Sequence, residues 1–210
     1  MKMLDIILSS IAIVVIGFMF YFTYMYLREK IEKVGRKPVS FKDEARYNKM
    51  LDKIMFDMYS QLHASNVFLA RLHNNGYWNN GRSMKKFTIM LEKFSPTSLS
   101  IQQEYKDFLC SRYAIAMDNL FFYHGYEEPD MSLCKDANIK RDFVDKYGYK
   151  SVYFFIIEQA NGDKTEEAFI GVLFKEQTLL KRDQIEYIKS KRFDILGLLN
   201  MVEPTHAINV

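Results

Sequence analysis

The sequence predicts an α+β domain, in which helices flank an antiparallel sheet, preceded by one transmembrane helix. Three observations support this prediction. Residues 6–27 form an apolar run without a charge. Two pairs of strand-like segments, at 66–94 and 151–175, are each joined by a turn rich in Asn and Gly. Segments 41–63 and 179–202 carry apolar residues at the helical period of about 3.6, and helices packed on the faces of such a sheet give an α+β fold.

The run from Ile6 to Leu27 is long enough to cross a bilayer as a helix. At about 1.5 Å per residue it spans a hydrocarbon core of about 30 Å. A cleaved signal peptide would have an apolar core of only about 7–15 residues, followed by small residues. Here bulky residues continue directly into Arg28, so we expect a retained anchor. An aromatic belt at its far end is predicted from Tyr21, Tyr24 and Tyr26.

Basic residues gather immediately after the anchor, in a predicted hinge at 28–40. They are Arg28, Lys30, Lys33, Arg36 and Lys37. Because Lys and Arg beside a span favour the cytoplasmic side, we expect the N-terminus outside and the globular domain in the cytoplasm. The same cations are suited to contacting anionic lipid headgroups. The predicted organisation is a flank at 1–5, the anchor at 6–27, the hinge at 28–40, the globular domain at 41–202 and a tail at 203–210.

Composition excludes several function classes. The formal net charge is +3, and much of the excess lies beside the anchor, so nothing indicates a nucleic-acid footprint. The two cysteines, Cys110 and Cys134, lie far apart without a CxxC or Cys/His cluster, which excludes a typical zinc site. In an oxidising compartment they could pair, whereas in the cytoplasm we expect them reduced and packed.

The domain is predicted to begin with an amphipathic helix at 41–63, directly after the hinge. We expect its apolar stripe to pack on the core, and a second use is dimerisation with the same helix of another chain. The stripe consists of Tyr47, Met50, Leu51, Ile54, Met55, Met58 and Leu62.

A hairpin follows the helix. Residues 66–73 alternate between two faces, with Val67, Leu69, Arg71 and His73 on one and Phe68, Ala70 and Leu72 on the other. The sequence NNGYWNNGRS is predicted to be a loop with Trp78 at its tip, and an exposed aromatic there suggests a partner contact. Residues 86–94 form the returning strand.

The remaining predicted elements alternate helix and strand. Ser98 or Ser100 is the candidate N-cap of the first helix. The elements are a helix at 98–117, a short strand at 119–126, a helix at 138–147, a hairpin of strands at 151–158 and 167–175 with its turn at 161–163, and an amphipathic helix at 179–202. The last helix directs Leu180, Ile185, Ile188, Ile195, Leu196 and Leu199 toward the core.

Four segments together resemble a GAF domain over residues 41–200. They are ARLHNNG at 70–76, GYKSVYFFIIE at 148–158, FIGVLFKEQ at 169–177 and QIEYIKSKRFDILGLL at 184–199. The resemblance implies a sensory or interaction module whose pocket lies between the sheet and its covering helices. One anchor before a GAF-like domain is similar in layout to small membrane proteins of tailed phages and to single-span phage holins.

Catalytic and cofactor motifs are absent from the sequence. There is no HExxH pair, GxSxG elbow, phosphate loop or dinucleotide fingerprint. An NKFDE-type set, by which cyclic-nucleotide-binding GAF domains are identified, is also missing, and neither cysteine has a context for bilin attachment. We therefore expect no catalysis, no metal and no cofactor.

Two groups of residues are candidate binding sites. Arg71, His73, Asn74 and Asn75 would hold an anionic or polar ligand, or His73 and the two Asn residues stabilise the turn. An aromatic set either lines a ligand pocket or forms ordinary core, and it consists of Phe121, Phe122, Tyr123, Tyr153, Phe154, Phe155 and Phe169.

Three functions remain open from the sequence. The first is a membrane-anchored sensor or interaction module without catalysis, dimeric through the 41–63 helix, that binds an unknown protein or small ligand. The second is a phage holin or lysis regulator, which requires the domain to lie in the periplasm, against the charge bias. The third is an enzyme with an unfamiliar site.

Overall fold

The computed structural model describes residues 16–27, 40–77, 83–157 and 168–201. The chain divides into two units, one of residues 1–40 with 203–210 and one of residues 41–202. In the first unit residues 16–27 are helical. Within the described ranges, no helix combines the length and apolarity needed to cross a membrane. Most of the predicted hinge at 28–40 and the first part of the predicted anchor, residues 6–15, lie outside these ranges.

The second unit is built on a six-stranded antiparallel sheet with the order β3-β2-β1-β6-β5-β4. The predicted α+β class with an antiparallel sheet is therefore confirmed. The strands are β1 (Asn66–Tyr77), β2 (Ser83–Phe94), β3 (Phe108–Leu109), β4 (Gly125–Glu128), β5 (Ser151–Ile157) and β6 (Ala168–Phe174).

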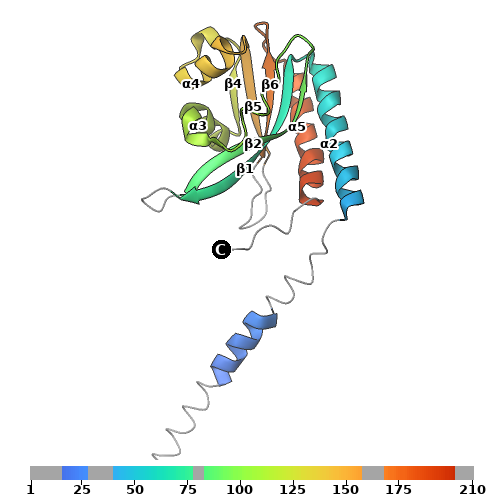
Figure 1. The fold of residues 1–210 in the computed structure, drawn as a ribbon, viewed down its shortest axis with the longest axis vertical. Helices are drawn as coiled ribbons and strands as arrows, with labels where there is room; N and C mark the ends of the chain where they lie inside the picture. The colour runs from blue at the N-terminus through green and yellow to red at the C-terminus, as the bar shows by residue number, and fades with distance from the viewer. Residues whose placement is uncertain (1–15, 28–39, 78–82, 158–167, 202–210) are drawn as a thin grey trace, which may run out of the picture. The chain divides into compact units, whose positions relative to one another are not determined.

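Helices cover both faces of this sheet. They are α2 (Phe41–Leu62), the 3-10 turn η1 (Cys110–Tyr113), α3 (Ala114–Phe122), the 3-10 turn η2 (Met131–Leu133), α4 (Ala137–Ile139), the π-helical segment η3 (Lys140–Asp145) and α5 (Arg182–Met201). Figure 1 shows α2 and α5 side by side on one face and α3 and α4 on the other. Because both faces are covered, every residue of β5 and β6 is buried.

The helices at the two ends of the domain follow their predicted periodicity. On α2, Leu51, Met55, Met58 and Leu62 are buried, whereas the predicted stripe member Met50 is 45% exposed. On α5 the buried residues are Ile188, Ile195, Leu198 and Leu199. These residues join the side chains of one sheet face in a core that we call the helical-pair core.

The two predicted hairpins are also confirmed, with one change. Strand β1 continues through Asn74 to Tyr77, where Asn74 pairs with Lys85 and Tyr77 with Ser83, so residues 74–77 are strand and not loop. The register shifts between those two pairs, which accommodates the Asn- and Gly-rich sequence within a paired strand. Residues 158–167, which include the predicted 161–163 turn, lie outside the described ranges.

The predicted helix at 98–117 is wrong in its first half. The carboxylate of Glu92 accepts hydrogen bonds from the backbone N–H groups of Ile101 (2.9 Å) and Gln102 (3.2 Å), which ties this segment to β2. Tyr105 accepts a strand-like bond at its carbonyl from Ile89, and Asp107 has φ of 55°, which no helix interior tolerates. The α-helix therefore begins only at Ala114, and neither Ser98 nor Ser100 caps one.

The predicted strand at 119–126 is also displaced. Helix α3 continues through Phe122, and the strand β4 starts at Gly125, where it pairs with Phe155. Local β propensity in NLFFY is overridden because Leu120 fills the core from a helical backbone. The predicted helix at 138–147 corresponds to α4 with η3, which span 137–145.

Candidate functional site

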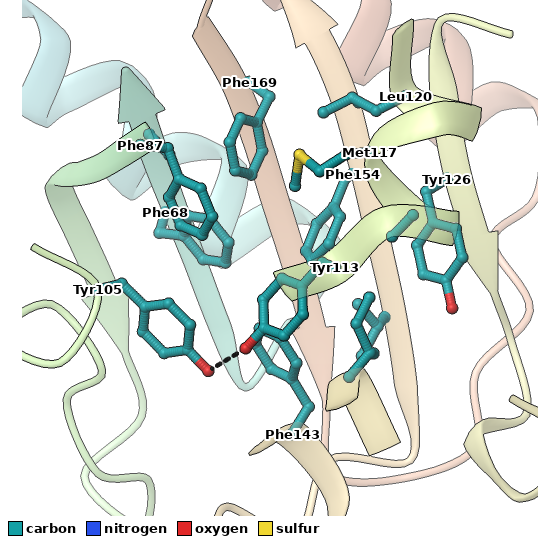
Figure 2. Close-up of a cluster of buried hydrophobic side chains, with 14 of the residues drawn as sticks. Phe68, Phe87, Tyr105, Tyr113, Met117, Leu120, Tyr126, Phe143, Phe154 and Phe169 are labelled. Atoms are coloured by element: carbon teal, nitrogen blue, oxygen red, sulfur yellow. Dashed lines mark hydrogen bonds between the residues drawn. The ribbon is translucent and has the colours of Figure 1, made fainter. Parts of the chain in front are cut away.

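The sheet face beneath α3 and α4 carries a closely packed group of rings, which we call the aromatic core. Its members are Phe68, Phe87, Tyr105, Phe108, Tyr113, Phe143, Phe154 and Phe169. Figure 2 shows most of these rings converging from the strands and from the segments that cover them. The centroids of Tyr105 and Phe108 lie 4.9 Å apart, and those of Phe87 and Phe169 lie 5.2 Å apart. Such contacts fill the space between the sheet and the helices that cover this face.

A chain of hydrogen bonds crosses this aromatic core. The hydroxyls of Tyr105 and Tyr113 are 2.9 Å apart (Figure 2). Tyr113 donates to Asp142 Oδ2 at 2.9 Å. Arg141 Nε donates to the other carboxylate oxygen at 2.8 Å. Burial raises the pKa of both tyrosines, so they act as neutral donors and acceptors. These hydrogen bonds hold together the three segments that carry Tyr105, Tyr113 and Asp142, without exposing a reactive group.

The pKa of Asp142 reflects two opposing effects. Burial alone would raise it, but hydrogen bonds from Arg141 and Tyr113 outweigh burial and hold the pKa below its ordinary value. The carboxylate is therefore ionised near neutral pH, and its charge is balanced by Arg141. This pairing is what allows an acidic side chain to lie under the sheet with only a small exposed fraction.

The aromatic set predicted from the sequence divides among different environments. Phe154 and Phe169 belong to the aromatic core, whereas Tyr153 and Phe155 lie on the opposite face, in the helical-pair core. Phe121 is partly buried against the aromatic core. Phe122 and Tyr123 are about three-quarters exposed, at 74% and 75%. The set therefore does not form a single pocket, because alternate strand residues face opposite sides of the sheet.

Arg71 and His73 do lie together on one face of β1, as predicted. Arg71 is opposite Thr88 and His73 is opposite Lys86 on β2. The His73 Nε2 lies 3.0 Å from Thr88 Oγ1, and the same hydroxyl accepts a bond from the backbone N–H of Asp107 at 3.0 Å. These contacts give His73 a structural role in holding the chain after Tyr105 against β2.

The other predicted members of this site are only partly described. Asn74 and Asn75 belong to β1, but their side chains lie outside the described part of the structure. Trp78 lies outside it as well. The proposed partner contact at Trp78 and the ligand site at Arg71 and His73 therefore stay predictions.

His73 makes the stability of the domain depend on pH. Burial lowers its pKa from the ordinary 6.5; Asp107 opposes this, and Lys86 and Arg71 reinforce it. The folded state then binds a proton more weakly than the unfolded chain, so stability falls as the pH drops below about 6.5 toward the lowered pKa. We expect His73→Gln to flatten the fall in melting temperature between about pH 7 and pH 5, measured by circular dichroism. A variant that follows the wild-type curve would contradict this role.

A cleft of about 540 Å³ lies at one end of the sheet, beyond the end of α2. Its polar groups bond one another: Lys175 Nζ donates to the Thr97 carbonyl at 2.9 Å, and the Lys175 backbone N–H donates to Ser65 Oγ at 2.9 Å. His63, with φ of 50°, ends α2 at its rim. We assign this cleft a structural role, since its bonds hold the ends of β1 and β6 to the segment after β2.

The described residues contain no group of three or more His, Cys, Asp or Glu side chains arranged to hold a metal. Cys110 and Cys134 do not bond to each other. Cys110 is buried, and the sulfur of Cys134 lies 3.3 Å from the hydroxyl of Tyr126. The alternative in which these cysteines form a disulfide is therefore not realised in the structure.

No protein-family model matches the chain, and no curated protein matches it. Solved structures do match. A far-red cyanobacteriochrome photoreceptor has a TM-score of 0.59 at 13% identity, over 85% of this chain and 98% of its own. The GAF domain region of a protein classed as a membrane protein from Geobacter sulfurreducens PCA has a TM-score of 0.57 at 11% identity. The match covers 76% of this chain and 96% of that one. The GAF domain of a two-component sensor histidine kinase from Bacillus halodurans has a TM-score of 0.51 at 13% identity. The match covers 72% of this chain and 95% of that one.

These likenesses agree with the features already described: an antiparallel sheet, two end helices on one face and shorter helices on the other. At 11–13% identity they establish the fold and not the ligand or partner. The described part of residues 41–201 thus has a GAF-like fold.

Proposed function

We propose that the chain is a membrane-anchored, non-catalytic sensor or interaction module whose GAF-like domain lies in the cytoplasm and works through its surface. The observation that carries this proposal is the filled aromatic core. Tyr113 and Phe169 are fully buried and Tyr105 is 1% exposed, so the chain's own rings occupy the region beneath α3 and α4. A partner then meets the outer surface of the domain.

The proposed first partner is a second copy of the chain, bound through α2. Three large apolar side chains on α2 are exposed to solvent: Phe41 (87%), Met50 (45%) and Phe56 (54%). Burying such side chains contributes about 1.5–3 kcal/mol each when burial is complete. Helix α2 also follows the basic hinge directly in sequence, so in two anchored chains the α2 helices begin at the same distance in sequence from the span.

The proposed orientation is tested by replacing the hinge cations. Exchange of Arg28, Lys30, Lys33, Arg36 and Lys37 for Gln is expected to give mixed topology, because Lys and Arg beside the span determine which side they stay on. Protease protection of a C-terminal tag in intact cells measures this. Wild-type protein should be fully protected and the variant partly digested.

Digestion of the wild-type tag from outside would contradict the proposal. It would favour the other function predicted from the sequence, a lysis regulator whose globular domain is extracytoplasmic. A matched control replaces the same number of cations on α2, at Arg46, Lys49 and Lys53, and just before and on α5, at Lys181 and Lys189. These lie farther from the span in sequence and should leave the topology unchanged.

A further inference from the structure

A cleft of about 680 Å³ lies beside the edge strand β4, on the sheet face that α5 covers. It is therefore separate from the aromatic core, which lies on the opposite face. This volume is within the range of about 300–1,000 Å³ that is usual for small-molecule sites. Its lining residues are Asn119, Tyr123, His124, Gly125, Glu127, Phe155, Lys189 and Arg192.

The apolar part of this β4 cleft is formed by two rings. Phe155 is 2% exposed and lies opposite Gly125 in the β4–β5 pairing. A Cβ on Gly125 would lie only 3.3 Å from the carbonyl oxygen of Phe154. The absence of a side chain at Gly125 therefore lets β4 lie close to β5 beside the Phe155 ring. Tyr123 is 75% exposed at the end of α3, where His124, with φ of 60°, turns the chain into β4. Tyr123 therefore offers the cleft an exposed ring on which a flat apolar group can pack, and the nearly buried Phe155 borders it.

The charged part of the cleft has both signs. Lys189 and Arg192 are one turn apart on α5, and Glu127 stands on β4. Arg192 Nε is buried and makes no hydrogen bond to the described residues. Across that same part of the chain, no ion pair joins Glu127 to either cation, and Lys189 bonds Glu186 at 3.2 Å instead. Arg192 also lines the cleft, and a guanidinium group binds a carboxylate through charge-assisted hydrogen bonds.

We propose that the β4 cleft binds a small zwitterion, an α-amino acid with an aromatic side chain. The carboxylate binds Arg192 and Lys189, the ammonium group binds Glu127, and the ring packs on Tyr123 beside Phe155. This class of ligand uses both the charges and the rings. The inference goes beyond the proposed role as an anchored dimer, because ligand binding is measured directly and requires neither anchoring nor dimerisation.

Calorimetric titration of the full-length protein in mild detergent tests the proposal with three probes. L-phenylalanine carries both charges, 3-phenylpropanoate lacks the amine and 2-phenylethylamine lacks the carboxylate. We expect L-phenylalanine to bind and each of the other two to bind at least about tenfold more weakly. Absence of L-phenylalanine binding at millimolar concentration, or equal affinity for all three probes, would overturn the proposal.

Two variants test the assigned contacts. Glu127→Gln should lower the affinity for L-phenylalanine to that for 3-phenylpropanoate. Arg192→Met should lower it toward that for 2-phenylethylamine, with Lys189 retaining part of the carboxylate contact. Lys191→Met is the matched control, since Lys191 is next to Arg192 on α5 but bonds Asp194 and does not line the cleft. Unchanged affinity for L-phenylalanine in Glu127→Gln overturns the proposal that the ligand is a zwitterion. Because the Glu127 side chain is exposed, this variant should fold, and it tests the proposal even if Arg192→Met does not fold.

Discussion

Phe154→Ala is expected to lower the free energy of unfolding by about 3–5 kcal/mol, the usual cost of truncating a buried Phe. Phe154 is 1% exposed on the central part of β5. Its ring lies 5.5 Å from that of Phe169 and 6.0 Å from those of Phe68 and Phe143. Because these neighbours come from β1, β6 and η3, no single segment can move to close the resulting cavity.

Denaturant unfolding measures this change, and Phe122→Ala is its control. Phe122 is 74% exposed at the end of α3, so its truncation is expected to change stability by no more than about 0.5 kcal/mol. If Phe154→Ala cost as little as Phe122→Ala, the aromatic core would not be closely packed. A ligand pocket beneath α3 and α4 would then become the better interpretation.

Gly171→Ala is expected to destabilise the domain by about 1–3 kcal/mol or more, because the added methyl group overpacks the core. A Cβ at Gly171 would lie 2.1 Å from Cζ of Phe68. Phe68 pairs with Gly171 across β1 and β6, and Phe154 pairs with it from β5. The ring of Phe68 cannot move aside easily, since it already packs against Phe154 and Phe169.

Gly197→Ala is the control, and we expect it to stabilise the domain instead of destabilising it. A Cβ at Gly197, on α5, meets nothing within 4 Å, and Ala is favoured over Gly in a helix by about 0.5–1 kcal/mol. We therefore expect Gly197→Ala to raise the melting temperature and Gly171→Ala to lower it. If both substitutions raised it, the close contact between Phe68 and β6 would be wrong.

Local pattern predicted much of the fold. Helices α2 and α5 and the hairpins β1–β2 and β5–β6 follow from apolar periodicity and from turn residues, which act over a few positions. The segment 98–126 was mispredicted because its conformation depends on partners distant in sequence. Glu92 bonds the backbone at Ile101 and Gln102, and Tyr105 is held between β2 and the hydroxyl of Tyr113.

The candidate binding sites likewise include some features that local sequence predicted and others that depend on residues distant in sequence. Arg71 and His73 share a face because they are two residues apart on one strand, and the sequence predicted this. The chain from Tyr105 through Tyr113 to Asp142 could not be predicted, because its members belong to different segments that only the tertiary fold brings together. Glu127 and Arg192 likewise line one cleft only because the tertiary fold brings α5 beside the edge strand β4.

Disulfide cross-linking in native membranes tests most directly whether the chain is an anchored dimer that works through its surface. Phe56→Cys places a thiol on the exposed face of α2, and Leu133→Cys places a matched exposed thiol in η2 on the opposite side of the sheet. The native thiols at Cys110 and Cys134 are replaced by Ser in both variants. We predict a cross-linked dimer for Phe56→Cys and little for Leu133→Cys. Failure of Phe56→Cys to cross-link, or equal cross-linking of the two variants, would contradict dimerisation through α2.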